Sequence, residues 1–152
     1  MNLRKAVIFI CFLVLVGIFL WSTLGREVRY ISQEQPDTQF EYETLFTTGL
    51  SKNDRPVDRI EEISMEQERI YFYITWRNLS NKEYKLKTMI YDGNGKHVFS
   101  YPHEFRPAEA IYNTWCWYNF NKVVDAPGYW RFEAYLDDQK VLEEQLKVLT
   151  GQ

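Results

Sequence analysis

The chain has 152 residues, a formal net charge of −3 and an aromatic content of 17%. Its slight acidity, and the lack of any run of more than two basic residues, argue against nucleic acid or anionic lipid as a partner. The length favours a single folded domain beside any targeting segment.

The first 25 residues predict a membrane anchor. Arg4 and Lys5 precede an apolar run, residues 6–21, in which Cys11 is the only polar side chain. A helix needs about 20 residues to cross a bilayer, and residues 6–25 supply that length. Because basic residues stay on the cytoplasmic side, we expect a single pass through the cytoplasmic (inner) membrane with the N-terminus inside and the remainder periplasmic. Trp21 lies where an interfacial aromatic anchor is expected.

A cleaved signal peptide is the alternative interpretation of this segment, because Thr23 and Gly25 are small residues at positions that a signal peptidase favours. The apolar run exceeds the about 7–15 residues of an ordinary signal-peptide core, which favours retention. Residues 26–38 are polar and contain Pro36, so we expect a short stalk before a domain at residues 39–152.

The expected domain cannot rely on an internal disulfide. Cys11 lies in the apolar run and Cys116 is alone after it. Stability must therefore come from packing, for which the 127 residues after the anchor supply 22 aromatic side chains.

Alternating apolar and polar residues predict a first strand over residues 40–47. Residues 49–55 interrupt the pattern, and we expect residues 56–68 to form a connection with one possible helical turn at 59–63. The clearest strand follows at residues 70–76. One of its faces carries Ile70, Phe72, Ile74 and Trp76, and the other carries Tyr71, Tyr73 and Thr75.

The second half of the chain continues in the same way. A strand at 85–91 meets the tetrapeptide Asp92-Gly93-Asn94-Gly95, which is the strongest hairpin signal in the chain. We expect a returning strand at 96–101, a loop bracketed by Pro102 and Pro107, and further strands at 110–120, 129–136 and 142–148. The predicted fold class is an all-β, Ig-like antiparallel β-sandwich of about seven strands, preceded by one N-terminal transmembrane helix.

Several short motifs share their order with a known family. They are FTTGL at 46–50, PVD at 56–58, IYF at 70–72, WRNL at 76–79, TW at 114–115 and GYWR at 128–131. This order resembles an uncharacterised Ig-like domain family of bacterial envelope proteins, often carried after a membrane anchor. The resemblance covers about residues 40–149. It implies the fold and the anchor but no activity, and residues 87–91 lack the His and Trp that the family pattern would have there.

The residues offer little catalytic chemistry. His97, His103, Glu104 and Cys116 are the only plausible start of a metal site, and their spacing matches no closed ligand pattern. Ser100 lies near both histidines but lacks the glycine-flanked elbow of a nucleophile. The adjacent carboxylates are expected to be solvated, because neighbours on a strand point to opposite faces. We therefore expect no enzyme activity, no cofactor and no metal.

The aromatic strand is the best candidate for a binding site. Trp115 and Trp117 fall on one parity, and Tyr112, Tyr118 and Phe120 on the other, yet only one face can line the core. The other is either covered by a loop or by the stalk, or exposed as a binding surface. The candidate contact residues are Tyr112, Trp115, Trp117, Tyr118, Tyr71 and Tyr73.

These observations predict a membrane-anchored accessory or interaction subunit of an envelope protein complex, with a protein partner. The alternative is a carbohydrate-binding module in which exposed aromatic rings stack on a polysaccharide.

Overall fold

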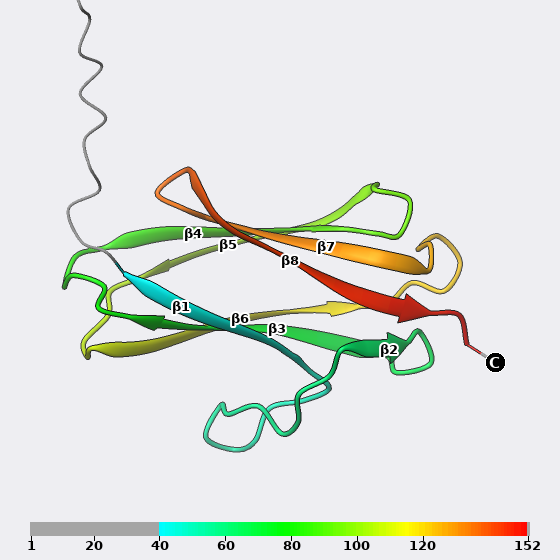
Figure 1. The fold of residues 1–152 in the computed structure, drawn as a ribbon, viewed down its shortest axis with the longest axis horizontal. Helices are drawn as coiled ribbons and strands as arrows, with labels where there is room; N and C mark the ends of the chain where they lie inside the picture. The colour runs from blue at the N-terminus through cyan, green and yellow to red at the C-terminus, as the bar shows by residue number, and fades with distance from the viewer. Residues whose placement is uncertain (1–39, 152) are drawn as a thin grey trace, which may run out of the picture. The chain divides into compact units, whose positions relative to one another are not determined.

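The computed structural model describes residues 40–151, and this part of the chain is all β (Figure 1). It holds eight strands and no helix: β1 (Glu41–Thr47), β2 (Glu62–Ser64), β3 (Arg69–Arg77), β4 (Tyr84–Tyr91), β5 (His97–Phe105), β6 (Ile111–Asn119), β7 (Gly128–Leu136) and β8 (Gln139–Leu149).

The strands form two sheets that pack face to face as layers (Figure 1). One has three antiparallel strands in the order β1-β3-β6, and the other has five in the order β2-β8-β7-β4-β5. In the larger sheet β2 runs parallel to β8, while the other pairs are antiparallel. Ring contacts join the two layers, because Phe132 of β7 lies 4.8 Å from Phe46 and 5.3 Å from Phe72 between ring centroids.

The predicted inward faces are confirmed. All four apolar side chains expected inside on β3 are at most 1% exposed. The side chains that point inward on β7 and β8 are buried as well: Trp130, Phe132, Ala134, Leu136, Leu142, Leu146 and Val148. Trp76 is fully buried, and its indole N–H donates to Thr114 Oγ1 at 2.8 Å, which satisfies the one polar atom of that ring.

Two expected segments differ from the structure. The possible helical turn at 59–63 is absent, because Ile63 is buried and β2 pairs with β8, Ile63 opposite Val148. The loop expected from Pro102 onward is wrong as well, since β5 continues to Phe105. An edge strand tolerates proline because one side of its backbone needs no hydrogen-bonded neighbour, and β5 is such an edge.

The predicted anchor, with Arg4, Lys5 and Trp21, and the predicted stalk at 26–38 lie outside the described residues. Among residues 40–151, no helix has the length and apolar character needed to cross a membrane.

The predicted hairpin turn at residues 92–95 also holds two loops together. Asp92 is 2% exposed, and its carboxylate accepts hydrogen bonds from the backbone N–H groups of Asn94 and Lys96. The backbone N–H of Gly93 donates to the carbonyl of Ala126 at 3.1 Å. The turn between β4 and β5 is therefore docked on the segment that leads into β7.

We predict that Gly93→Ala destabilises the domain. An added Cβ would collide with the carbonyl oxygen of Pro127 and lie 2.9 Å from the Gly128 Cα, where backbone must move to make room. The expected loss is about 1–3 kcal/mol in the free energy of unfolding, measured by denaturant titration of tryptophan fluorescence.

Gly49→Ala is the matched control for this experiment. A Cβ at Gly49 meets only the Val57 side chain at an ordinary 3.5 Å, so its effect is expected to be small. Equal losses in both variants would contradict the docking of the turn.

Candidate binding site

Four of the six aromatic candidates gather on the outer face of the three-stranded sheet. In the antiparallel pairing of β3 with β6, Tyr71 lies opposite Trp117 and Tyr73 lies opposite Trp115. The pairing therefore places both tryptophans on the face that points away from the core.

The other two candidates point inward. Tyr112 and Tyr118 are partly buried and pack against the core, beside Trp76 and Trp130 respectively. The Tyr118 hydroxyl donates to the Asp125 carboxylate at 3.0 Å, and burial together with this acid raises the pKa of the phenol. These contacts give Tyr118 a structural role, and it is not part of the outer cluster.

The outer aromatic residues differ in exposure. Tyr73 is only 5% exposed and stacks on Trp115, with ring centroids 6.1 Å apart and an angle of 8° between the planes. Trp117 is 41% exposed. The Arg69 guanidinium lies 6.0 Å from the centre of the Trp117 ring and donates a hydrogen bond to the Tyr71 hydroxyl at 3.1 Å. The outer face is thus covered at Tyr73 and open at Trp117.

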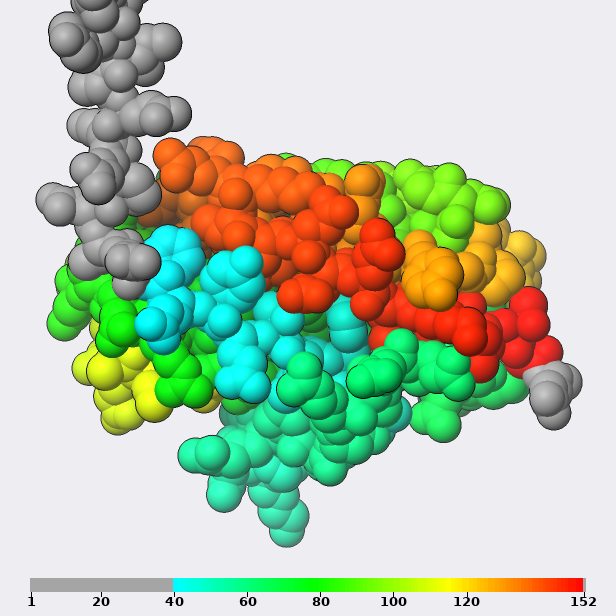
Figure 2. Space-filling view, viewed as in Figure 1, coloured from blue at the N-terminus to red at the C-terminus, as the bar shows by residue number. Residues whose placement is uncertain are grey.

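Tyr73 is covered by a small hairpin after β1, residues 49–57. The backbone N–H of Val57 donates to the Gly49 carbonyl at 3.1 Å, and that of Ser51 donates to the Arg55 carbonyl at 2.8 Å. This hairpin projects from the body of the domain (Figure 2, teal). Burial raises the pKa of the Tyr73 hydroxyl. The charge of Arg55 near the hairpin tip lowers this pKa in part, and that of Asp54 raises it.

The base of the hairpin is closed by one carboxylate. Asp58 accepts hydrogen bonds from the Thr47 hydroxyl at 2.5 Å, the Thr48 backbone N–H at 2.8 Å and the Thr48 hydroxyl at 2.6 Å. Desolvation alone would raise the pKa of Asp58, but these hydrogen bonds outweigh it and hold that pKa below its usual value. The side chain of Asp58 therefore fixes where the hairpin leaves the sheet.

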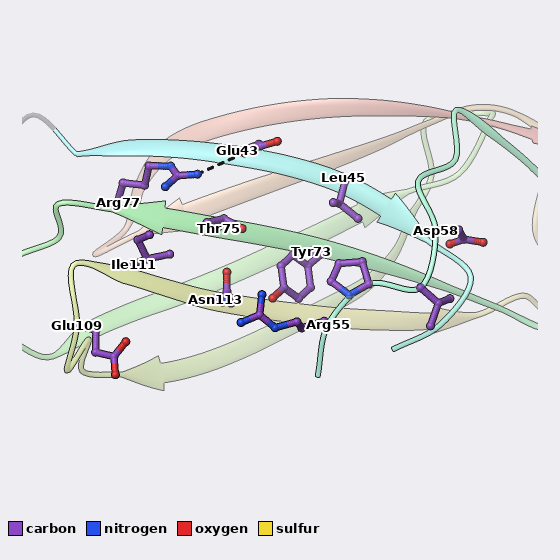
Figure 3. A pocket seen from close by; sticks show the side chains of 12 residues that line it. Glu43, Leu45, Arg55, Asp58, Tyr73, Thr75, Arg77, Glu109, Ile111 and Asn113 are labelled. Atoms are coloured by element: carbon purple, nitrogen blue, oxygen red, sulfur yellow. Dashed lines mark ion pairs between the residues drawn. The ribbon is translucent and has the colours of Figure 1, made fainter. Parts of the chain in front are cut away.

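A groove of about 720 Å³ lies between this hairpin and the start of β6 (Figure 3). A second hollow of about 380 Å³ adjoins it at Arg55 and extends to Trp115. Tyr73, Thr75 and Asn113 line the groove from the sheet. Its other lining residues come from β1, the hairpin and the residue after it, the end of β3, the segment that leads into β6 and the first residue of β6: Glu43, Leu45, Arg55, Pro56, Val57, Asp58, Arg77, Glu109 and Ile111.

The charges in the groove are mixed. Glu43 is shared by Arg77 at 3.7 Å and Arg59 at 4.0 Å, and all three side chains are more than one-third exposed. Such exposed pairs contribute little to stability, so they remain available to exchange partners. Arg55 makes no ion pair with any residue of the described range. Its guanidinium can therefore donate hydrogen bonds to a carboxylate from outside the described residues.

The residues that line the groove include no serine, cysteine or histidine, so they do not form a nucleophile paired with a histidine base. His97 Nε2 lies 2.8 Å from Ser100 Oγ, but both residues are on β5 in the other sheet. Cys116 faces the core, where burial raises the pKa of its thiol to about 12, so almost no thiolate forms near neutral pH. Across residues 40–151, no three His, Cys, Asp or Glu side chains gather as metal ligands.

Sequence reasoning missed the polar lining of the groove. Glu43, Arg55, Arg77 and Glu109 look like ordinary solvated charges when only their neighbours in sequence are considered. The alternation of apolar and polar residues along β3 placed Thr75 on the outer face. No pattern within residues 49–57 indicates that this segment folds back onto Tyr73.

No protein-family model matches the chain, and a search of the curated proteins finds no match. Among solved structures, an alkylpurine DNA glycosylase from Pseudomonas fluorescens is similar with a TM-score of 0.48 at 10% identity, over 73% of this chain and 30% of the glycosylase. A Listeria innocua β-glucosidase is similar with a TM-score of 0.44 at 15% identity, over 83% and 20% of the two chains.

A CARDB domain from Pyrococcus furiosus, in complex with two metal ions, has a TM-score of 0.41 at 11% identity, over 72% of this chain and 87% of that domain. This chain thus spans less than one-third of the length of the glycosylase and of the β-glucosidase. Similarities this distant carry no conclusion about activity or ligand.

We predict that the contribution of Asp58 to stability is lost in acid. A folded-state pKa below the unfolded value means that the carboxylate stabilises the fold at neutral pH, and that this contribution disappears as the pH falls through the folded pKa. Asp58→Asn is expected to lower the free energy of unfolding by at most about 1 kcal/mol at neutral pH, because the carboxylate is exposed to solvent, and this effect should vanish once the pH is below the folded-state pKa of Asp58.

Asp138→Asn serves as the control, because Asp138 is exposed and has a positive φ of 66° that asparagine also tolerates. Denaturant titrations across this pH range measure both variants. A deficit for Asp58→Asn that is constant with pH would refute the role of the carboxylate charge.

Proposed function

We propose that this chain is a membrane-anchored, non-catalytic binding module, an interaction or accessory subunit of an envelope protein complex. In this proposal residues 1–25 anchor the chain in the cytoplasmic membrane, residues 26–38 are a stalk, and the β-domain lies in the periplasm or its equivalent. The partner contacts the outer face of the β1-β3-β6 sheet.

We also propose that the domain belongs to the Ig-like sandwiches. A β1-β3-β6 sheet packed on a sheet that contains β8, β7 and β4 in that order has the strand neighbours of such folds. The motif order of the sequence supports the same assignment.

The observation that carries the proposal is the open aromatic end of the outer face. Trp117 is 41% exposed and has Tyr71 and Arg69 as neighbours. Tryptophan, tyrosine and arginine are the residue types that dominate the energetics of protein interfaces. The adjoining groove adds a concave, partly apolar surface that includes Arg55, which has no ion pair among residues 40–151. A protein segment that carries a carboxylate suits this combination.

Carbohydrate binding is the second candidate, but the ring geometry favours a protein. Tyr73 and Trp115 are parallel, yet they stack on each other and Tyr73 is buried. The remaining pair, Tyr71 and Trp117, has ring planes 43° apart. The outer face therefore lacks a flat, open platform of coplanar rings on which a sugar chain would lie.

We predict that Trp117→Ala abolishes capture of the partner. Full-length tagged protein is purified from detergent-solubilised membranes of the cells that make it, and the bound proteins are compared with those on wild type. Truncating an exposed aromatic anchor is expected to weaken binding by at least about 2 kcal/mol, roughly 30-fold.

Tyr129→Ala is the matched control, because Tyr129 is an exposed aromatic residue, 67% accessible, on β7 of the other sheet. The proposal fails if no protein is recovered with wild type, or if both variants lose the partner equally. In affinity gels that contain envelope polysaccharide, retardation of wild type but not of Trp117→Ala would favour the sugar alternative.

A further inference from the structure

One edge of the three-stranded sheet lacks the usual protection against strand pairing. Within the described residues β6 pairs only with β3, so no strand is hydrogen-bonded to the other side of its backbone. Its nine residues include no proline and no charged side chain. Native proteins normally blunt such an edge with charges, proline or a short strand.

The other three edges of the described domain carry these devices. β1 contains Glu41 and Glu43, β5 contains Pro102 and Glu104, and β2 is three residues long. The contrast identifies β6 as the edge that is suited to accept another strand.

The side of the domain next to β6 is also incompletely closed. Phe99, Tyr101 and His103 of β5 lie opposite buried residues of β4, which places them on the core side of that edge strand, yet they remain half-exposed. They face the inward and outward aromatic residues of β6: Phe99 lies 5.8 Å from Tyr118, and Tyr101 lies 6.2 Å from Trp117.

By contrast, the opposite side of the domain is closed by its own chain. Phe46 of β1 forms an isolated bridge with Ile60 just before β2, and Thr44 donates a hydrogen bond to Glu144 of β8 at 2.8 Å. Partly exposed aromatic residues occur there too, since Tyr42 is 44% exposed beside Trp76, so the two sides differ in closure by the chain and in the unpaired backbone of β6.

We propose that β6 pairs antiparallel with β6 of a second copy of this chain, about a two-fold axis perpendicular to the sheet. Such an axis keeps each side chain on its own face, so one residue of β6 must lie opposite itself. If all nine residues of β6 pair, Trp115 at the centre of the strand lies opposite Trp115 of the other copy. Tyr112 then lies opposite Tyr118 of the other copy.

The charges at the two ends of β6 favour a second copy of the chain as the partner, and they favour antiparallel over parallel pairing. Glu109 lies two residues before β6, whereas Arg69 donates a hydrogen bond to Asn119 at the far end at 2.7 Å. Neither charge has an ion pair within residues 40–151. Antiparallel pairing of two copies brings the acidic end of one strand beside the basic end of the other, whereas a parallel pair would oppose like charges.

The dimer joins the two outer faces into one six-stranded sheet. Pairing uses the backbone edge of β6, so the groove between residues 49–57 and the start of β6 stays open. This inference is independent of the proposed partner, because self-association is measured with no other protein present.

The test is sedimentation velocity of the full chain in detergent micelles over a range of concentrations. Wild type is expected to show a reversible monomer-dimer equilibrium. The variants W115K and W115E each place like charges opposite one another, and each is expected to weaken the dimer roughly tenfold or more. Mixing the two variants creates opposite charges at the axis and is expected to restore a heterodimer.

Tyr129→Lys adds a charge at an exposed aromatic position of the other sheet and should leave the dimer unchanged. Hydrogen exchange on wild type gives a readout that needs no variant: amides of residues 111–119 should exchange more slowly at concentrations where the dimer forms. A wild type that is monomeric throughout overturns the proposal. So does a dimer that W115K and W115E both leave intact, or one without added protection in β6.

Discussion

The register of β3 is the constraint on which the rest of the domain depends. Its side chains alternate without interruption, so one face supplies the centre of the core and the other supplies the floor of the groove. A shift by one residue would exchange these faces and bury the tyrosines in place of the apolar residues. The hydrogen bond from the Trp76 indole to Thr114 makes that shift costlier, because it would leave a buried donor without an acceptor. The groove and the hydrophobic core therefore both depend on the register of β3.

This dependence explains which parts of the fold could be read from the sequence. Alternation with a period of two is a local property, and it located β3, β4, β7 and the division of aromatic residues on β6 between two faces. The turn at residues 92–95 was predictable for a similar reason, since its glycines and Asp92 satisfy the turn from within four residues. Whether the outer face is covered could not be decided locally, and the structure shows both states, at Tyr73 and at Trp117.

The features that escaped prediction all depend on contacts between distant segments. β2 has only three residues and exists because Ile63 finds a buried place beside Val148, 85 positions along the chain. The strand character of residues 102–105 depends on β4 as a neighbour and on the position of β5 at an edge, which a proline in isolation argues against. The groove likewise combines charges from four separate segments, none of which stands out in sequence.

The closure of residues 49–57 at their own base has a consequence for how this surface can vary. Asp58 and the two threonines hold the entry and exit of the hairpin together, and none of these three hydrogen bonds involves its tip. Loop tips with closed, surface-exposed bases accept substitutions and insertions at small thermodynamic cost. The tip that carries Asp54 and Arg55 can therefore change in sequence or in length while the two sheets fold unchanged.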